Sequence, residues 1–446
     1  MDQATHDELS SKIVAPETRR LIWVAAACWL AINLGPSLVS LMKAGPQPGR
    51  PYFVPDFFAD YASARNFLEN RDVYTPHEQT LRRYLHGSST GAPTFRYNVH
   101  PPSSVLLAVP LAWLGFSSAF LFWNVLSLAC IAGALWIIQR ELELAATVWS
   151  IFPAISLLMV YTPLWDQVRM GQLSALLLLL LTGAWSALRS GRPILSGSLL
   201  AVAASVKLFP GFLFLYLLFQ RRWRSLAAGL VALDVITVLT ASILGWDAYR
   251  SYLTQVLPEA QWYRVLWGNL SLPGFWSRLF ESIPTFAGTL VHARPVIESP
   301  SIFWIALTAS AVTVLFLLAW VSMGQNSREH FDLGYACAII AMLLLSPVTW
   351  SHSLLMLILP ILIFWRRRSS VSGRVLLVGL VILISVDPKI SWSLIARDGG
   401  SPETTPLGSL VVASLACYAL LGLLVMGLTE ALRLQRAATR SITTAD

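Results

Sequence analysis

Two aspartates four residues apart are the first candidates for chemistry in this sequence. Asp56 and Asp60 lie in the stretch PDFFADYASARNFLEN, residues 55–70. Positions i and i+4 share one face of a helix, so the two carboxylates are expected to be neighbours, each raising the pKa of the other. A carboxylate at a membrane surface can act as a general base toward a hydroxyl. A solvated cap in the first turn of a helix, directly after Pro55, would have the same sequence.

A single lysine, Lys207, lies in the otherwise apolar segment 193–220. Inserting an unpaired lysine into a membrane costs roughly 2.5–3.5 kcal/mol, so Lys207 is expected to have a counter-charge. A carboxylate on another helix would make it part of a structural ion pair. A lipid-linked phosphate, which is an anion at the depth of the headgroups, would make it a binding residue.

Four other polar stretches begin or interrupt apolar helices and contain candidate substrate-binding residues. Histidine can donate to a phosphate, and Trp or Phe beside Asn suits a sugar, whose faces are apolar and whose rim is polar. Helix capping, a solvated helix end or an interfacial loop would explain the same stretches. The candidates are His352 in SPVTWSHS, Gln172 with Asp166 and Arg169 in WDQVRMGQL, Asn269 and Arg278 in GNLSLPGFWSRLF, and Tyr97 and His100 in YNVHPPSS.

The composition indicates an integral membrane protein. The chain has 446 residues, of which 55% are hydrophobic and 13% charged, whereas soluble domains have about 25% charged residues. The net charge of +8 is explained by short basic cytoplasmic loops and predicts no nucleic-acid partner. The four cysteines lie in apolar runs, which predicts neither a disulfide framework nor a metal site. The sequence lacks phosphate-binding and dinucleotide glycine motifs, which argues against an ATP-driven pump.

Apolar runs predict an all-α, polytopic fold with about twelve passes. A span needs about 20 apolar residues. The candidates are 21–42, 118–138, 145–162, 172–188, 225–245, 302–322, 333–347, 353–365, 373–387 and 408–429. The segment 193–220 is too short for two full crossings and is predicted to form two short helices with Lys207 at the apex. Residues 102–116, interrupted by Pro110, are predicted to form an interfacial or re-entrant helix.

Basic clusters predict the orientation of these helices. They flank short loops or termini and are therefore expected to be cytoplasmic. They are Arg19-Arg20, Arg189 with Arg192, Arg221-Arg222 with Arg224, Arg366-Arg367-Arg368, and Arg433 with Arg436 and Arg440. This orientation makes 1–20 and 431–446 cytosolic tails around a single transmembrane domain, 21–430, with outer loops 43–101, 246–300 and 388–406. The candidate residues of the previous paragraphs then all lie on the outer side.

The order and spacing of these motifs resemble glycosyltransferase family 87, the polyprenyl-phosphate-mannose-dependent mannosyltransferases of the GT-C superfamily. The resemblance covers roughly residues 50–370. The motifs are Asp56-Phe57 with Tyr61, Ala64 and Val73-Tyr74; Tyr97 with Pro101-Pro102; Gly171-Gln172; Lys207 with Pro210; Arg221-Arg222-Trp223-Arg224; Gly268-Asn269 with Ser271; and Ser346-Pro347 with Trp350 and His352. Asp60 and His100 depart from the pattern, since aromatic or apolar residues are expected at both positions.

The resemblance implies an inverting transferase of GT-C fold in the plasma membrane, with its site on the extracytoplasmic side. The donor would be a polyprenyl phosphate carrying a hexose, above all mannose, and the acceptor a hydroxyl of a glycolipid or glycan. Asp56 would be the general base, and Lys207 and His352 would bind the donor phosphate. The substrate-binding candidates are Asp60, Gln172, Asn269, Arg278, Tyr97 and His100. This chemistry needs no cofactor, and the sequence leaves its dependence on a divalent metal open.

Two other classes of function would use a similar chain. A secondary transporter or lipid-linked sugar flippase would place its site near the middle of the membrane between internal repeats, and no repeat is apparent. A ligase or polymerase that moves a whole polyprenyl-linked glycan would share the phosphate site, so only the identity of the donor separates it from a hexosyltransferase.

Overall fold

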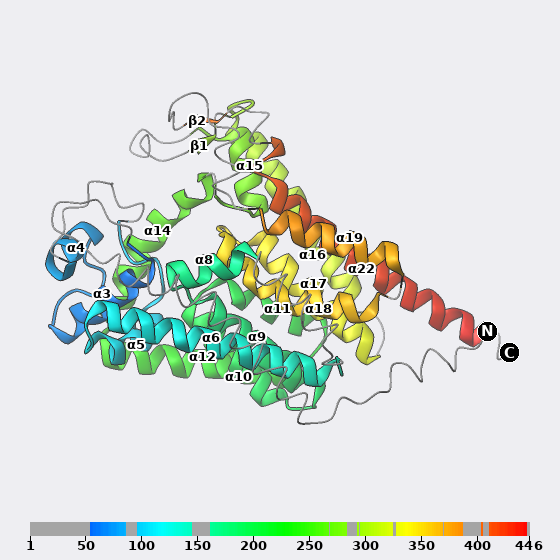
Figure 1. The fold of residues 1–446 in the computed structure, drawn as a ribbon, viewed down its shortest axis with the longest axis horizontal. Coiled ribbons are helices and arrows are strands. Elements are labelled where there is room, and N and C mark those ends of the chain that lie inside the picture. The colour runs from blue at the N-terminus through cyan, green and yellow to red at the C-terminus, as the bar shows by residue number, and fades with distance from the viewer. Residues whose placement is uncertain are drawn as a thin grey trace.

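The computed structural model describes residues 54–85, 96–144, 161–266, 268–282, 292–293, 295–323, 327–368, 370–386, 403–404 and 410–443, with side chains as far as 437. These parts are almost wholly helical (Figure 1). A pair of two-residue strands, β1 (His292–Ala293) and β2 (Glu403–Thr404), is parallel. The predicted all-α class is confirmed. The predicted spans 21–42 and most of 145–162, the loop 388–406 except for β2, and the basic pair at 19–20 lie outside the described residues.

The described helices of the first half include the segment around Lys207. They are α3 (Phe57–Leu68), α4 (His77–Leu85), α5 (Pro102–Ala112), α6 (Phe116–Glu141), α8 (Thr162–Met170), α9 (Ser174–Arg189), α10 (Pro193–Val206), the 3₁₀ turn η1 (Phe209–Phe212) and α11 (Leu213–Phe219). The predicted short hairpin around Lys207 is thus present as α10, η1 and α11, and the predicted helix over 102–116 is present as α5.

Helices of the second half include three long apolar ones, α12, α16 and α22. The described helices of this half are α12 (Trp223–Leu244), α13 (Trp246–Ser251), the π-helix η2 (Tyr252–Val256), α14 (Leu257–Ala260), the 3₁₀ turn η3 (Gln261–Val265), α15 (Leu272–Phe280), α16 (Pro300–Met323), α17 (Arg328–Leu345), the 3₁₀ helix η5 (Ser351–Leu357), α18 (Ile358–Arg367), α19 (Val371–Ile384) and α22 (Leu415–Thr443).

Four of the described helices are long and apolar enough to cross a membrane, namely α6, α12, α16 and α22. A fifth crossing is formed if α8 and α9, which are bent by 119°, count as one span. The prediction of about twelve passes is therefore not confirmed. Some predicted spans do not form long apolar helices in the structure. The segment 333–347 lies mostly in the 18-residue α17, which has three charged residues near its start, and 353–365 is divided between η5 and α18.

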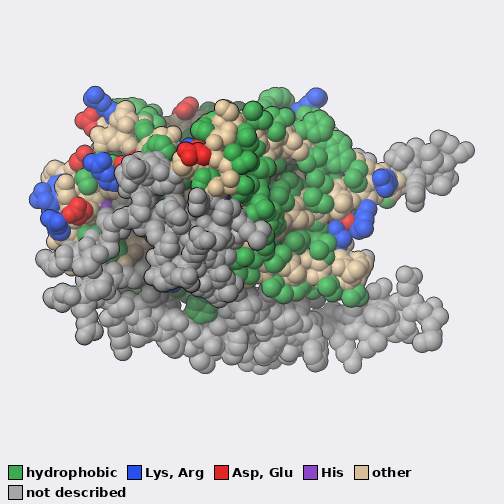
Figure 2. Space-filling view, turned by 90° about the horizontal axis from the view of Figure 1, so that it is seen from above, with side chains coloured by type: hydrophobic (Ala, Val, Ile, Leu, Met, Phe, Trp, Pro, Cys, Tyr) green, Lys and Arg blue, Asp and Glu red, His purple; other side chains and the backbone are tan. Residues whose placement is uncertain are grey.

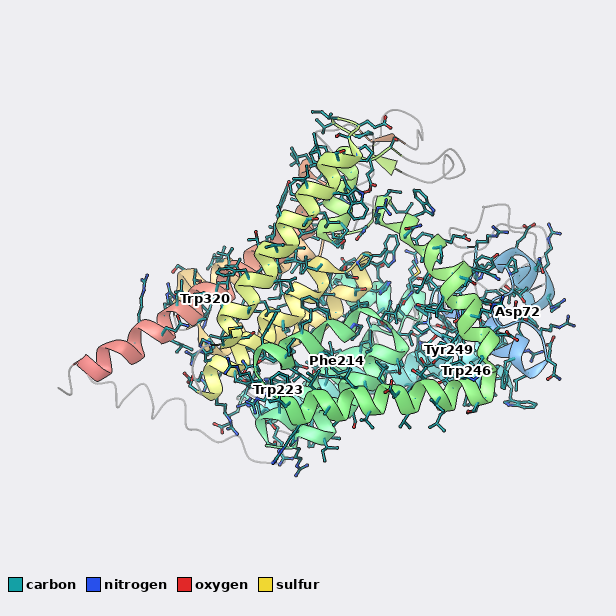
Figure 3. The ribbon with its side chains drawn as sticks, turned by 180° about the vertical axis from the view of Figure 1, so that it is seen from behind. Asp72, Phe214, Trp223, Trp246, Tyr249 and Trp320 are labelled. Atoms are coloured by element: carbon teal, nitrogen blue, oxygen red, sulfur yellow. The ribbon has the colours of Figure 1, made fainter. Side chains whose placement is uncertain are left out.

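The position of α12 shows how the fold meets a membrane. Its 22 residues correspond to about 33 Å, close to the ~30 Å hydrocarbon core of a bilayer. Trp223 and Trp246 lie at its two ends (Figure 3) and are 59% and 65% exposed. Tryptophans are enriched at membrane–water interfaces, so these positions fit a helix that crosses a membrane. In the space-filling view, hydrophobic side chains cover the middle of the described surface and basic side chains lie toward its two ends (Figure 2).

The largest core cluster forms around α17. Every residue of α17 from His330 to Leu344 is buried, because α17 is packed against α16, α18 and α22. A second, smaller core lies beneath α3, where Phe57 is stacked on Trp123 with ring centroids 5.6 Å apart. This aromatic cluster fixes α3 against α6, and so determines where the first turn of α3 is placed.

The two ends of the bundle have different chemistry. One end contains the basic clusters, where Arg189 lies 3.6 Å from both Glu141 and Asp332 and Arg367 pairs with Glu329 at 2.8 Å. Three helices that have one terminus near this basic end, α9, α10 and α17, have the other terminus next to Gln172, Lys207 and Ser346, respectively. The predicted convergence of polar residues on the end opposite the basic clusters is therefore present in the described fold.

Candidate active site

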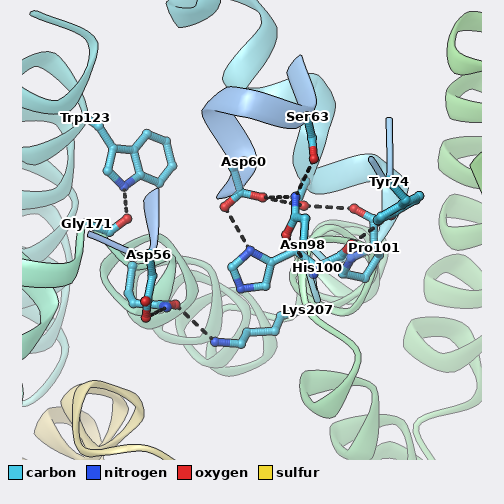
Figure 4. A network of polar contacts seen from close by, with 12 residues as sticks. Asp56, Asp60, Ser63, Tyr74, Asn98, His100, Pro101, Trp123, Gly171 and Lys207 are labelled. Atoms are coloured by element: carbon cyan, nitrogen blue, oxygen red, sulfur yellow. Dashed lines mark hydrogen bonds and ion pairs between the residues drawn. The ribbon is translucent and has the colours of Figure 1, made fainter. Parts of the chain in front are cut away.

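Asp56 immediately precedes α3 but does not cap it. It occupies the N-cap position, yet its side chain accepts no hydrogen bond from the helix backbone. The helix-cap interpretation of its carboxylate is therefore wrong. Oδ2 of Asp56 instead accepts a hydrogen bond from Nε2 of Gln172 at 2.6 Å (Figure 4). The carboxylate is half-buried, so it has a fixed partner and remains within reach of a bound molecule.

The turn between α8 and α9 places Gln172 beside Asp56. Gly171 adopts a left-handed conformation with φ of 62°, and a Cβ there would lie 2.7 Å from a ring atom of Phe120 and 2.8 Å from Cβ of Phe57. Its carbonyl accepts a hydrogen bond from Nε1 of Trp123 at 2.7 Å. The expectation that Gly171 permits a close approach is confirmed. A larger residue would push this turn away from α3 and α6.

Lys207 follows α10, where the chain becomes extended at the helix end. Its Nζ donates to Oε1 of Gln172 at 3.3 Å, so Gln172 joins the lysine to Asp56. Burial lowers the pKa of Lys207 to about 8, against the opposing effect of the charges of Asp56 and Asp60. The predicted counter-charge is therefore present as two nearby carboxylates, and Gln172 lies between the ammonium group and Asp56.

Asp60, one turn after Asp56, is buried in a network of its own. Its Oδ2 lies 2.8 Å from Nδ1 of His100, and its Oδ1 accepts from Nδ2 of Asn98 at 3.1 Å and from Oγ of Ser104 at 3.2 Å. Only 5% of Asp60 is exposed. These contacts place Asp60 against the protein, and its carboxylate oxygens are occupied by side chains of the segment 98–104.

The two carboxylates differ in electrostatics, in contrast to the expected mutual effect. Burial raises the pKa of Asp56, and the hydrogen bond from Gln172 and the charges of His100 and Lys207 oppose it only in part. Burial also acts to raise the pKa of Asp60, but the charge of His100 and the three hydrogen bonds outweigh it and lower that pKa. The prediction that each raises the pKa of the other is correct only for Asp56, to which Asp60 adds the smallest contribution.

His352 lies in η5 and is buried, with 4% of the residue exposed. Its Nδ1 is 3.1 Å from Oγ of Ser174, the first residue of α9. Its Nε2 is buried and has no hydrogen-bond partner within the described residues. Burial, with the nearby charges of Lys207 and His100, keeps the pKa of His352 well below its usual range. The interpretation of His352 as a solvated helix end is therefore wrong, and a neutral imidazole nitrogen is left for a ligand.

Asn269 and Arg278 hold the framework together instead of joining the Asp56 network. Nδ2 of Asn269 donates to the Pro347 carbonyl at 2.9 Å, and its Oδ1 accepts from the Thr349 backbone at 3.0 Å. Nη1 of Arg278 donates to the Asn269 carbonyl at 2.6 Å. Both residues are at most 2% exposed. They fix the segment 346–350, and through it the start of η5, and their contact with substrate stays a prediction.

Tyr97 is joined to neither aspartate by a hydrogen bond in the described structure, although it precedes Asn98, which binds Asp60. It is packed at the edge of the core cluster formed by α5 and η2, and the guanidinium of Arg96 lies 5.3 Å from its ring centre. Asp166, from the α8 stretch, accepts a hydrogen bond from Ser351 and so ties α8 to η5. The structure therefore brings together Asp56, Asp60, Gln172, Lys207, His100 and His352, and gives the remaining candidates other surroundings.

Several residues of the site were not singled out from the sequence. Asn98 and Ser104 bind Asp60, Ser174 binds His352, and Trp123 binds the Gly171 carbonyl. Asn98 and Ser104 belong to the polar stretch YNVHPPSS, so its placement on the same side as Asp60 was a usable signal. Within the described residues, no group of three His, Cys, Asp or Glu side chains is arranged to hold a metal ion.

The arrangement can perform proton transfer next to an anion site. Asp56 is a half-buried carboxylate with a raised pKa, which suits a group that takes a proton from a hydroxyl. Lys207 and the unpartnered nitrogen of His352 are suited to bind an anion, such as a phosphate, by charge and by hydrogen bonding. The base and the anion-binding side chains lie at the end of the bundle where α3 packs against α5 and α6.

Comparison with known proteins gives a consistent set of matches. A sequence model of the family described as Glycosyltransferase family 87 matches residues 98–347. A polyprenol-phosphate-mannose-dependent alpha-(1-2)-phosphatidylinositol pentamannoside mannosyltransferase of Mycobacterium tuberculosis (strain CDC 1551 / Oshkosh) is 30% identical over 332 residues, 71% of this chain and 69% of the relative. A polyprenol-phosphate-mannose-dependent alpha-(1-2)-phosphatidylinositol mannoside mannosyltransferase of Mycobacterium tuberculosis (strain ATCC 25618 / H37Rv) is 24% identical over 455 aligned positions, 96% of each chain.

A third relative has a smaller overlap. A polyprenol-phosphate-mannose-dependent alpha-(1-2)-phosphatidylinositol pentamannoside mannosyltransferase of Mycolicibacterium smegmatis is 28% identical over 261 residues, 57% of each chain. The family match begins at residue 98, in the segment that binds Asp60, and ends at residue 347, shortly before His352. The match over 96% of the chain extends the similarity to the region of Asp56 as well.

Proposed function

The chain belongs to glycosyltransferase family 87, and from this premise we propose that it transfers mannose from a polyprenyl phosphate to a hydroxyl of a glycolipid on the outer face of the plasma membrane. It is a membrane glycosyltransferase, and the donor follows from the names of its relatives, which are polyprenol-phosphate-mannose-dependent enzymes. The same names contain phosphatidylinositol mannosides, which supports a glycolipid of that class as the acceptor.

One observation carries the proposal: the hydrogen-bonded chain from Asp56 through Gln172 to Lys207. An acceptor hydroxyl must lose its proton as it attacks the anomeric carbon, and Asp56 is the half-buried carboxylate that can take it. The leaving phosphate gains negative charge at the same moment, and the ammonium group of Lys207 supplies the opposite charge. Gln172 spaces base and cation so that they do not neutralise each other in a direct ion pair.

The donor phosphate is assigned to Lys207 and His352. The buried Nε2 of His352 lacks a hydrogen-bond partner within the described residues, and such an orphaned group costs free energy unless a ligand satisfies it. Attack on the anomeric carbon from the side opposite the phosphate inverts that centre. The outer location is supported by the basic clusters at the far end of the bundle, which favour the cytoplasmic side. A GT-C arrangement with about twelve passes remains part of this proposal.

The test is transfer of mannose from a polyprenyl phosphate donor by Asp56→Asn. The substitution keeps the size of the side chain and removes the base, so we expect transfer to fall about 100- to 10,000-fold while thermal unfolding of the purified protein is unchanged. Asp247→Asn is the matched control, because it makes the same chemical change at an exposed aspartate in the first turn of α13, just after the end of α12. Full activity in Asp56→Asn would remove the basis of the proposal.

The same assay separates the related functions. Flux of a lipid-linked sugar across proteoliposomes without a covalent product would indicate a transporter. Transfer of a larger glycan from the same class of lipid would indicate a ligase or polymerase, since the phosphate-binding residues would be shared. Incorporation of a single mannose, dependent on Asp56, distinguishes the proposed hexosyltransferase from both.

A further inference from the structure

The buried pair of Asp60 and His100 has no part in the steps above, yet it adjoins the site. Asp60 accepts hydrogen bonds at 2.8 Å from the ring of His100 and at 3.1 and 3.2 Å from Asn98 and Ser104. With 5% of the residue exposed, Asp60 faces the protein rather than a substrate. Besides its charge, which acts on Asp56 and Lys207, Asp60 contacts one titratable side chain among its hydrogen-bond partners in the described structure, namely His100.

His100 is fixed at three points. Its backbone N–H donates to Oδ1 of Asn98 at 3.1 Å, its carbonyl accepts from the hydroxyl of Tyr74 at 2.8 Å, and its Nδ1 is bound to Asp60. These contacts direct the opposite ring edge, with Nε2, away from Asp60. In Figure 4 the ring lies between Asp60 and Lys207. Nε2 makes no hydrogen bond to any residue that the structure describes, so it is available to a ligand.

The titratable groups around His100 come from three parts of the fold, α3, the end of α10 and η5. They are Asp60 in α3, Asp56 before α3, Lys207 after α10 and His352 in η5. Burial is the main influence on the pKa of Asp56 and of His352, and the charge of His100 lowers the pKa of both, which shows that the ring is within electrostatic range of each. Three basic side chains, Lys207, His100 and His352, thus converge beside one carboxylate that acts as the base. Convergent basic groups of this kind suit a phosphate.

The transfer reaction creates charge at the position that these groups surround. The acceptor oxygen forms a bond to the anomeric carbon, the bond from that carbon to the phosphate oxygen breaks, and its electron pair stays on that oxygen. The proton of the acceptor goes to Asp56. The phosphate changes from a diester with one negative charge to a monoester with two. A hydrogen-bonding N–H group aimed at this phosphate therefore stabilises the transition state and the products more than the bound sugar donor.

Resting on the proposed function, we propose that His100, held in place by Asp60, binds the departing phosphate of the donor through Nε2. Asp60 is then a positioning residue that acts through His100 and does not touch the sugar. Asp60 and His100 are also the two residues that depart from the family pattern, and they bind each other.

The first test compares a short phosphate with its alcohol. Binding of farnesyl phosphate and of farnesol to the detergent-solubilised full-length protein is measured for the wild type and for His100→Gln. Loss of a charge-assisted hydrogen bond is expected to weaken farnesyl phosphate about 10-fold or more and to leave farnesol unchanged. In the transfer assay kcat should fall more than the donor KM rises. His77→Gln is the matched control, because His77 begins α4 at the same end of the molecule and its ring contacts Phe58.

The second test asks whether Asp60 acts through His100. Asp60→Asn keeps an acceptor for Asn98 and Ser104 and is expected to lower farnesyl phosphate binding in the same direction. The double variant with Asp60→Asn and His100→Gln should bind farnesyl phosphate no worse than His100→Gln alone, because the effects of two residues that act as one unit are not additive. Additive losses, or unchanged discrimination between phosphate and alcohol in His100→Gln, would overturn the proposal.

The wild type and His100→Gln test two different assignments. If the wild type itself bound farnesyl phosphate no better than farnesol, the donor assignment under the proposed function would be wrong. If the wild type discriminates and His100→Gln does so equally well, only the role of His100 is wrong. Should Asp60→Asn fail to fold, as judged by thermal unfolding in detergent, the comparison of His100→Gln with His77→Gln still decides the result.

Discussion

The bridge formed by Gln172 predicts a pH-dependent defect. In Gln172→Met the side chain keeps its length but loses the 2.6 Å hydrogen bond to Asp56 and the 3.3 Å contact with Lys207. That hydrogen bond lowers the pKa of Asp56, whose overall pKa is raised by burial. Removing the bond therefore raises the pKa of Asp56 further. Since the base must be ionised, kcat/KM declines as pH falls through this pKa, and the acid limb of the pH profile moves to higher pH.

The size of the effect follows from the type of hydrogen bond that is lost. A hydrogen bond to a charged group contributes about 1.5–3 kcal/mol, and 1.36 kcal/mol corresponds to a tenfold change in rate. On the acid limb, kcat/KM of Gln172→Met is therefore expected to be about 10- to 100-fold lower than that of the wild type. The deficit should shrink as pH rises, because Asp56 becomes ionised in both proteins.

The assay is mannose transfer from a polyprenyl phosphate donor, with kcat/KM measured across the pH range. Gln220→Met is the matched control, because Gln220 ends α11 at the basic end of the bundle. A loss in Gln172→Met that is the same at every pH would show that the substitution disturbs the turn instead of the charge on Asp56. An unchanged profile would show that Gln172 does not support Asp56, and the reasoning would be refuted.

Two further predictions concern Lys207 and Gly171. The pKa of Lys207 is lowered to about 8, and the ammonium form is needed to bind phosphate, so kcat/KM should fall as pH rises through about 8. Lys207→Arg should move that decline to higher pH, because a guanidinium stays protonated. A decline at the same pH in the variant would contradict the assignment of Lys207 to the phosphate. Gly171→Ala should destabilise the fold by about 1–2 kcal/mol from the left-handed backbone alone, with more from the overlap with Phe120 and Phe57, and an unchanged unfolding temperature in detergent would contradict this account of the turn.

Much of the site could be predicted because its residues are unusual for their surroundings. A lysine within the apolar segment 193–220 and an aspartate directly before an amphipathic stretch stand out in any membrane protein, since burying a charge is costly. The structure joins Asp56, Gln172 and Lys207 by hydrogen bonds. Their helices and the short hairpin were recognisable from apolar runs and basic clusters, because both follow from the sequence alone.

The roles of Asp60 and Asn269 could not be predicted in the same way. Asp60 binds His100, 40 positions along the chain, and Asn269 binds Thr349, 80 positions along. Whether a polar residue faces a substrate or satisfies a distant backbone group depends on which segments meet in the fold. The sequence shows that a polar group is present in an apolar region, which requires a partner, but it does not show which partner.

The sequence by itself determined that this is a helical membrane protein with its unusual polar residues at the end of the bundle opposite its basic clusters. Only the tertiary structure decided which apolar helices are enclosed and which face outward: α17 is buried on every side, whereas α12 exposes a row of Val and Leu residues. Both helices have similar apolar sequences, because lipid chains and a protein core are equally free of water. Hydropathy cannot distinguish the two environments, and the number of membrane crossings therefore depends on packing.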